Sequence, residues 1–244
     1  MPAPPPVLCD DARVDSRPLH PWQAVTIGSG LMLHAALALQ TDLAPLLADL
    51  AALDAAVGPS GRLFLTTDGS WGSIALVERA HDASGGASRS GDATPALAHA
   101  PNVRGLLSST DWTVLSCYLI RQPPHGTLPW HFDNQAIHLA ECRLLIPLLA
   151  PRDAVTWIGH EAVAYCAGTA WAGDFSFPHQ VENPTDAPRV VLAIDVLTAP
   201  AVRRLLPSDL AHCISQRQEL GSLSRNLLLK WRAQQPRPGR DGHA

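Results

Sequence analysis

Apolar residues recur at helical spacing along positions 30–57, which predicts an α-helix that ends at "VGPSG". The next stretch, "RLFLTTDGSWGSIALVE", carries two β-type runs around Asp68 and Gly69 and predicts a β-hairpin. From Thr113 the pattern changes to short apolar runs separated by Pro and Gly. Seven such runs favour a closed β-sandwich or barrel over a parallel sheet with crossover helices. They are "TVLSCYLIR", "RLLIPLL", "AVTWI", "AVAYC", "TAWAGDFSF", "HQVEN" and "RVVLAIDVL".

Helical spacing of leucines returns over residues 201–233. We therefore predict one domain over residues 19–233, mainly β with flanking α-helices. Its expected parts are a helical and hairpin part to about residue 111, a β core over 112–199 and helices over 200–233. A Pro-rich tail over 1–18 and a second tail over 234–244 are expected to be flexible. The small polar stretch 81–101 is either a surface loop or a lid over a site.

Composition narrows the class of protein. Hydrophobic residues make up 46% of the 244 positions and charged residues 16%, which suits a sizeable core. The net charge of −4 and the scattered Lys and Arg residues argue against a nucleic-acid partner. The most apolar window, residues 30–39, is about half a membrane span, and no secretory signal precedes it. Five cysteines without a CxxC pair fit neither a disulfide framework nor a zinc site, so we expect a cytoplasmic protein with no membrane partner.

One short stretch, "PWHFD", could carry chemistry. If Trp130 to Asp133 is extended, the side chains of His131 and Asp133 point to the same face. An imidazole and a carboxylate on one face form two-thirds of the 2-His-1-carboxylate triad of non-haem iron oxygenases. The pair alone is weak evidence, because exposed polar pairs are common. Among the remaining histidines His179 is the best third ligand, since it begins a strand that returns into an apolar core strand.

Two arginines lie beside predicted core strands. Arg189 shares a strand face with Asp195, and Arg143 directly precedes "LLIPLL". A buried guanidinium is costly unless it meets an anion, and its geometry suits bidentate binding of a carboxylate. An internal ion pair of Arg189 with Asp195 or Glu182 is the structural alternative to a bound ligand.

Together these residues resemble a known family. The pattern consists of HxD at His131 and Asp133, Arg143 before "IPL", Trp171, "HQVEN" from His179, and Arg189 ten residues after His179. It is similar to the aspartyl/asparaginyl β-hydroxylase family of Fe(II)/2-oxoglutarate-dependent dioxygenases, and most of all to the cis-proline-hydroxylase type. The resemblance covers residues 112–199.

The resemblance implies a double-stranded β-helix (jelly-roll, cupin-like) core and the catalytic metal ligands His131, Asp133 and His179 for Fe(II). It implies that Arg189 binds the distal carboxylate of 2-oxoglutarate, while Arg143 binds either the other end of 2-oxoglutarate or a substrate carboxylate. Trp130 is a tentative substrate contact, although core packing is the favoured interpretation of a tryptophan there. The implied reaction uses O2, converts 2-oxoglutarate to succinate and CO2, and hydroxylates an unactivated C–H bond. The retained Asp133 argues against a halogenase and sets the chain apart from the animal aspartyl hydroxylases.

Three matters stay open at this point. A non-catalytic cupin-like module that binds a metal or a small acid would share the fold and the histidines. The amphipathic stretch over 205–231 could be a docking face for a homodimer, or could simply cover the barrel. The substrate could be a free amino acid, an amino acid on a carrier protein, or a peptide-like natural-product intermediate.

Overall fold

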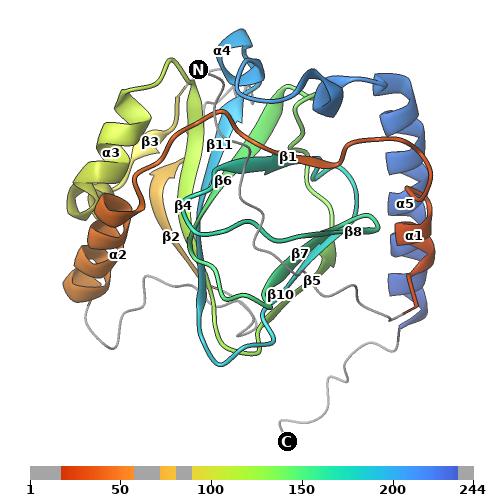
Figure 1. Cartoon of the computed structure of the whole chain (residues 1–244), viewed down its shortest axis with the longest axis horizontal. Helices are drawn as coiled ribbons and strands as arrows, with labels where there is room; N and C mark the ends of the chain where they lie inside the picture. The colour runs from red at the N-terminus through yellow and green to blue at the C-terminus, as the bar shows by residue number, and fades with distance from the viewer. Residues whose placement is uncertain (1–17, 58–71, 81–89, 236–244) are drawn as a thin grey trace, which may run out of the picture.

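Two antiparallel β-sheets face each other in the computed structural model, which describes residues 18–57, 72–80 and 90–235 (Figure 1). The larger sheet has the strand order β1-β9-β6-β11-β4-β2-β3, and the smaller has β5-β10-β7-β8. The larger sheet consists of β1 (His34–Ala36), β2 (Gly72–Glu78), β3 (Asp92–Ala93), β4 (Val114–Gln122), β6 (Glu141–Leu149), β9 (Trp171–Gly173) and β11 (Arg189–Leu197). The smaller consists of β5 (Thr127–His131), β7 (Val155–Ile158), β8 (Glu161–Val163) and β10 (His179–Glu182).

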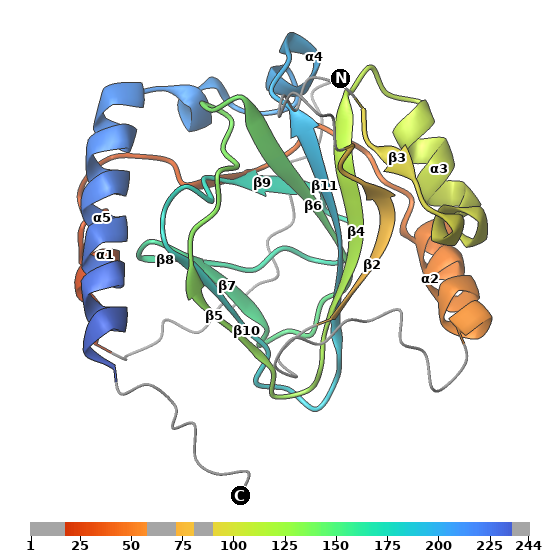
Figure 2. The ribbon, with the colours of Figure 1, turned by 180° about the vertical axis from the view of Figure 1, so that it is seen from behind.

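This arrangement is a jelly-roll core and confirms the predicted fold class. Each of the seven predicted β-type runs after Thr113 supplies a strand. The central strand β11 is buried along Val190–Val196 because strands flank it on both sides and helices cover the outer face of its sheet. Figure 2 shows the same two sheets from behind.

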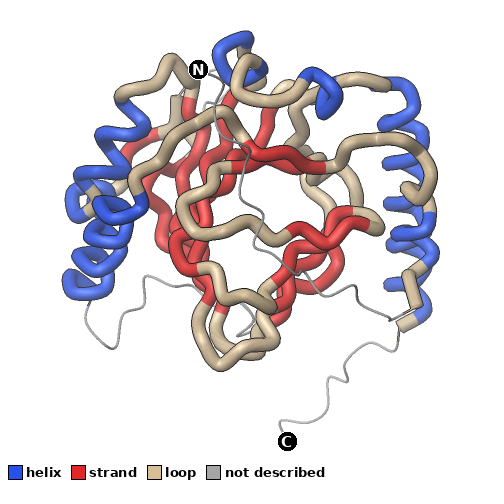
Figure 3. The backbone as a smooth tube through the Cα atoms, in the orientation of Figure 1, coloured by secondary structure: helices blue, strands red, loops and turns tan. Residues whose placement is uncertain are grey.

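Helices lie on both flanks of the strands (Figure 3). On one flank α2 (Leu43–Val57) and α3 (Pro101–Ser108) lie beside β2 and β4. The Asp49 carboxylate of α2 accepts hydrogen bonds from the Val103 N–H and the Asn102 side chain, each at 2.7 Å. It therefore occupies the first turn of α3, where free N–H groups favour an anion.

The opposite flank is formed by α1 (Pro21–Ala24) and α5 (Ile214–Gln234) (Figure 1). Ser224 of α5 donates a hydrogen bond to the Trp22 carbonyl at 2.6 Å, and Arg217 of α5 reaches the Asp174 carboxylate at 2.9 Å. The link between β11 and α5 contains α4 (Pro200–Arg203) and a 3-10 helix over Ser208–Ala211. The C-terminal helical prediction is thus confirmed in outline.

The predicted helix over residues 30–57 is wrong in its first half, since α2 begins at Leu43 and His34–Ala36 is strand β1. Leu31, Leu33, Ala35 and Leu37 are all buried, with less buried residues between them, which is strand periodicity. Pairing of β1 with β9 sets this conformation. The alternation over residues 31–37 is too short to stand out from the helical spacing of the leucines that follow it.

Other predictions fall partly on residues that are not described. The first strand of the predicted hairpin lies outside the described residues, whereas its second strand is β2, which pairs with β4. Of the loop or lid over 81–101, residues 81–89 are outside the description, and the remainder holds β3 and a 3-10 helix over Pro95–His99. The two predicted tails are likewise almost wholly outside it.

Two findings bear on the compartment. No helix in the described ranges is both long and apolar enough to cross a membrane. Cys117, Cys142 and Cys213 are free thiols, as expected of a chain without a disulfide framework, whereas Cys166 is disulfide-bonded.

Candidate active site

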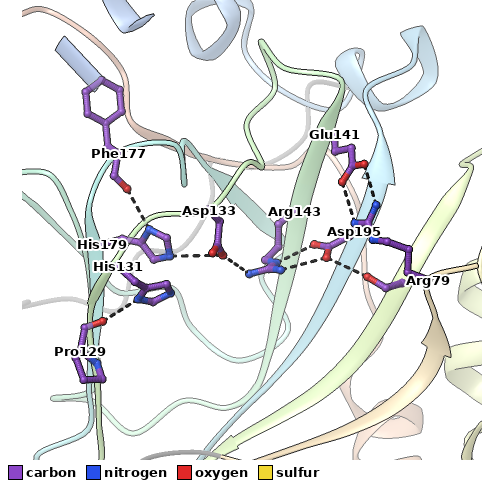
Figure 4. A network of polar contacts seen from close by, with 10 residues as sticks. Arg79, Pro129, His131, Asp133, Glu141, Arg143, Phe177, His179 and Asp195 are labelled. Atoms are coloured by element: carbon purple, nitrogen blue, oxygen red, sulfur yellow. Dashed lines mark hydrogen bonds and ion pairs between the residues drawn. The ribbon is translucent and has the colours of Figure 1, made fainter. Parts of the chain in front are cut away.

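The two predicted histidine ligands face each other on neighbouring strands. His131 ends β5 and pairs in register with His179, the first residue of β10. Their ring centroids are 4.0 Å apart. Asp133 follows β5, and its N–H donates to the Phe175 carbonyl at 2.8 Å, which holds this turn against the end of β9. One ligand atom from each of the three residues lies within 4.8 Å of the other two (Figure 4).

Backbone carbonyls fix the tautomer of both rings. His131 Nδ1 lies 2.7 Å from the Pro129 carbonyl, and His179 Nδ1 lies 3.1 Å from the Phe177 carbonyl. A carbonyl oxygen can only accept, so each Nδ1 carries the hydrogen and each Nε2 offers its lone pair. Burial lowers the pKa of His131, and burial together with the neighbouring His131 lowers the pKa of His179 well below its ordinary value. Both rings are therefore neutral at neutral pH, as metal ligation requires.

A charged chain leads away from the third ligand. Arg143 donates from Nη1 to Asp133 Oδ2 at 2.8 Å, and from Nε and Nη2 to the two oxygens of Asp195 at 2.8 and 3.1 Å (Figure 4). Ser116 donates to Asp195 at 2.9 Å from the next strand. Strand register causes this arrangement, because Asp195 of β11 lies opposite both Arg143 and Ser116. The guanidinium of Arg143 is thus engaged by two carboxylates.

A cavity opens beside the triad and is lined by residues of both sheets. Arg189 at the start of β11 lies in its wall, as does Arg143. Within the described part of the chain Arg189 makes one side-chain hydrogen bond, from Nη2 to Thr156 Oγ1 at 3.2 Å, and no ion pair. Burial lowers its pKa to about 10, so it still carries its charge at neutral pH. The predicted alternative, a pair of Arg189 with Asp195, is wrong because Asp195 is bonded to Arg143.

Trp130 lies apart from this cavity. It packs with Trp22 and Trp157 in a second apolar cluster beneath α5, and the residues that line the cavity do not include it. Its ring points to the opposite side of β5 from the His131 ring, as alternation along a strand requires. The structure gives no support to Trp130 as a substrate contact.

Sequence reasoning missed two residues of the site. Thr156 sits in the predicted strand "AVTWI", where a lone threonine carried no signal, yet it is the hydrogen-bond partner of Arg189. Phe175 packs on His179 with ring centroids 4.9 Å apart. Only the pairing of β10 with β7 and the return of the chain after β9 bring these side chains to the site.

The donor set fits Fe(II). Two imidazole Nε2 atoms and one carboxylate on adjacent positions are the ligands that non-haem iron oxygenases use, and the carbonyls behind the rings supply the supporting hydrogen bonds typical of metal-binding histidines. One neighbouring cation and an adjoining cavity leave room for an anionic small molecule.

Solved structures with a similar chain trace include three oxygenases. A 2OG-Fe(II) oxygenase-family oxidoreductase from Burkholderia pseudomallei is 16% identical, with 80% of this chain and 97% of that chain covered and a TM-score of 0.48. The α-ketoglutarate-dependent carbocyclase SnoK from nogalamycin biosynthesis is 13% identical, with 80% and 87% covered and a TM-score of 0.49. The nickel complex of the non-heme monooxygenase ThoJ is 17% identical, with 78% and 96% covered and a TM-score of 0.41. We draw no conclusion on activity from these similarities.

The family of this chain follows from its sequence. No protein of curated function matches it. Residues 52–199, more than half of the chain, match the aspartyl/asparaginyl β-hydroxylase family and include all three candidate metal ligands and both arginines of the cavity, and the chain belongs to this family.

Proposed function

We propose that this Fe(II)/2-oxoglutarate-dependent dioxygenase hydroxylates an unactivated C–H bond of a small amino-acid-derived substrate, either free or attached to a carrier. The observation that carries the proposal is Arg189, a half-buried cation without a carboxylate partner in the described structure, placed in the same cavity as His131 and His179. The amino-acid class rests on the resemblance to the cis-proline-hydroxylase type.

The protein groups divide the work between holding the metal and holding the cosubstrate. When bound, Fe(II), 2-oxoglutarate and O2 supply an oxidative decarboxylation to succinate and CO2, coupled to hydroxylation of the substrate. His131, Asp133 and His179 would hold the metal and leave further coordination positions for ligands that are not protein. Because both Nε2 atoms are already unprotonated, metal binding need not displace a proton from either ring.

Arg189 would bind the distal carboxylate of 2-oxoglutarate. Its guanidinium fork matches a carboxylate, and Thr156 orients the fork through Nη2. The ligand would supply the negative charge that the fold withholds from this arginine. Apolar side chains of the cavity wall, among them Leu128, Leu145 and Val191, exclude water from the space between Arg189 and the triad.

We assign Arg143 the role of holding Asp133, not of binding 2-oxoglutarate or the substrate. Its donors already meet Asp133 and Asp195, so it has less capacity for a further carboxylate than Arg189 has. Through these bonds it would orient the Asp133 carboxylate and offset part of its charge. This assignment replaces the two roles that the resemblance implied for Arg143.

An anaerobic titration of the apoprotein with Fe(II) and then 2-oxoglutarate tests the proposal. We expect the weak visible charge-transfer band of a metal-bound keto acid in the wild type. Arg189→Ala should weaken 2-oxoglutarate binding roughly 10- to 100-fold, the effect of one lost charge-assisted hydrogen-bonded pair. His179→Ala should remove the band, while Arg104→Ala, an exposed arginine on α3, should leave it unchanged.

Succinate formation separates the enzyme from the non-catalytic alternative. With O2 and ascorbate present, candidate amino acids and carrier-bound amino acids should raise the rate of succinate release over the rate without substrate. A folded protein that binds iron, gives no band and releases no succinate would be a binding module, which the family match disfavours. A homodimer through α5 and a cytoplasmic location stay predictions.

A further inference from the structure

A line of aromatic rings runs from the candidate metal site to the surface. Phe175 contacts His179 with centroids 4.9 Å apart, and Trp171 lies 5.9 Å from Phe175. Tyr165 stacks on Trp171 at 5.1 Å with an interplanar angle of 28°, and His34 meets Tyr165 at 5.6 Å. Every step is therefore a van der Waals contact between rings. The metal ligands and the oxygen chemistry proposed above do not use Trp171, Tyr165 or His34.

At the outer end of this line, Tyr165 can lose a proton to His34 as well as an electron. The Tyr165 hydroxyl and His34 Nδ1 are 2.8 Å apart, and His34 Nε2 lies 3.4 Å from Glu161 Oε2. A hydrogen on Nε2 directed at Glu161 leaves Nδ1 as the acceptor of the Tyr165 proton. Burial lowers the pKa of His34 to about 4, so the ring is neutral and able to accept at neutral pH.

At the inner end of the line, the described part of the chain offers Trp171 no such proton acceptor. The indole Nε1–H of Trp171 is buried and has no hydrogen-bond acceptor among the described residues. An oxidised Trp171 therefore has no group to take its proton, whereas an oxidised Tyr165 has His34. This difference favours movement of an oxidising equivalent outward from Trp171 to Tyr165, where proton transfer traps it.

We infer that Phe175, Trp171, Tyr165 and His34 form a relay that carries an oxidising equivalent from the metal site to the surface when O2 is activated without substrate. One electron leaves Tyr165 and passes by way of Trp171, across the Phe175 ring, to the oxidised metal site, which is reduced by one electron. The phenolic proton moves to His34 Nδ1, giving a neutral tyrosyl radical and an imidazolium beside Glu161. The relay rests on the proposed dioxygenase function, which supplies the oxidant.

Recovery requires a reductant, and the surface gives access to one. His34 and Tyr165 line a surface groove, and the side chains of His34 and Glu161 are 21% and 28% exposed. A small one-electron reductant such as a thiol or ascorbate, itself oxidised by one electron, would return the electron to Tyr165 while His34 returns the proton. The relay would protect the cavity wall from self-oxidation.

Rapid-freeze EPR tests this relay, because the chain has 2 tyrosines and Tyr118 provides a matched control. Protein loaded with Fe(II) and 2-oxoglutarate is mixed with O2 in the absence of substrate. We expect a tyrosyl radical signal that narrows on ring deuteration of tyrosine, is lost in Tyr165→Phe and persists in Tyr118→Phe. Tyr165→Phe keeps the ring that stacks on Trp171 and removes only the hydroxyl, and its thermal unfolding is compared with the wild type.

Mass spectrometry gives a second measurement on the same samples. Loss of the outlet should raise the fraction of oxidised Trp171 peptide in Tyr165→Phe, and in His34→Gln as well, relative to Tyr118→Phe. A tyrosyl signal that survives in Tyr165→Phe, or succinate formation without any tyrosyl signal in the wild type, would overturn the relay and leave the dioxygenase intact. Absence of succinate as well would overturn the proposed function, and the relay with it.

Discussion

Two arginines of this protein, the fully buried Arg217 of α5 and the half-buried Arg189 in the cavity wall, differ in how many of their donors the fold satisfies. Arg217 donates to Asp174 at 2.9 Å and to the backbone carbonyls of three further residues at 2.7 to 3.0 Å. Arg189 has one bond, to the Thr156 hydroxyl. A buried cation with four hydrogen bonds to the protein stabilises the structure, whereas one with a single such bond has donors available to a ligand.

Removal of Arg217 should have the largest effect on stability. Arg217→Ala should lower the free energy of unfolding by about 3–5 kcal/mol, because it leaves the Asp174 carboxylate buried without its partner and releases α5 from the sheet. Urea unfolding of the apoprotein measures this. Lys230→Ala, an exposed position on the same helix, should change it by less than about 0.5 kcal/mol. Equal effects of the two variants would mean that the Arg217 bonds contribute nothing net.

Arg189 should behave in the opposite way. Arg189→Met removes a desolvated charge without orphaning a carboxylate, so the unfolding free energy of the apoprotein should stay level or rise by about 1 kcal/mol. In the wild type with Fe(II) bound, 2-oxoglutarate at 100 times its dissociation constant should add about 2.7 kcal/mol of stability. At the same concentration most of that gain should be missing in Arg189→Met. A destabilised apoprotein would show instead that Arg189 is structural.

Arg143 lies between these two cases, since its partners include a metal ligand. Asp195→Asn weakens the hold on Arg143, which is then free to draw Asp133 away from the metal position. The affinity for Fe(II) should fall roughly 10- to 100-fold, the usual effect of losing a group that supports a metal ligand. Competition with a metal-binding dye measures it. Glu141→Gln, which disturbs the half-exposed ion pair with Arg79 on the same strand, serves as the control and should leave the affinity unchanged.

Much of the site could be predicted from sequence because strand periodicity decides which side chains share a face. The shared face of His131 and Asp133 needs only local alternation, whereas the full ligand set and the role of Arg189 were predicted from the family resemblance. The partners Asp195 for Arg143 and Thr156 for Arg189 depend on the register between strands distant in sequence, and no local pattern encodes that register. Strand β1 was taken for helix for a similar reason, because its conformation is set by pairing with β9.

The smallest predicted effect concerns pH and tests whether His34 is neutral in the folded protein. Burial holds its pKa at about 4, below the ordinary 6.5, so between these values the unfolded chain binds a proton that the folded chain does not. His34 therefore lowers stability as the pH falls below about 6.5, and its share should reach about 1 kcal/mol by pH 5.5. Urea unfolding of wild type and His34→Gln at pH 7.0 and 5.5 isolates this share. The loss on acidification should be smaller in His34→Gln than in the wild type or in the exposed-site control His99→Gln. Equal losses in all three proteins would mean that the fold does not lower the pKa of His34.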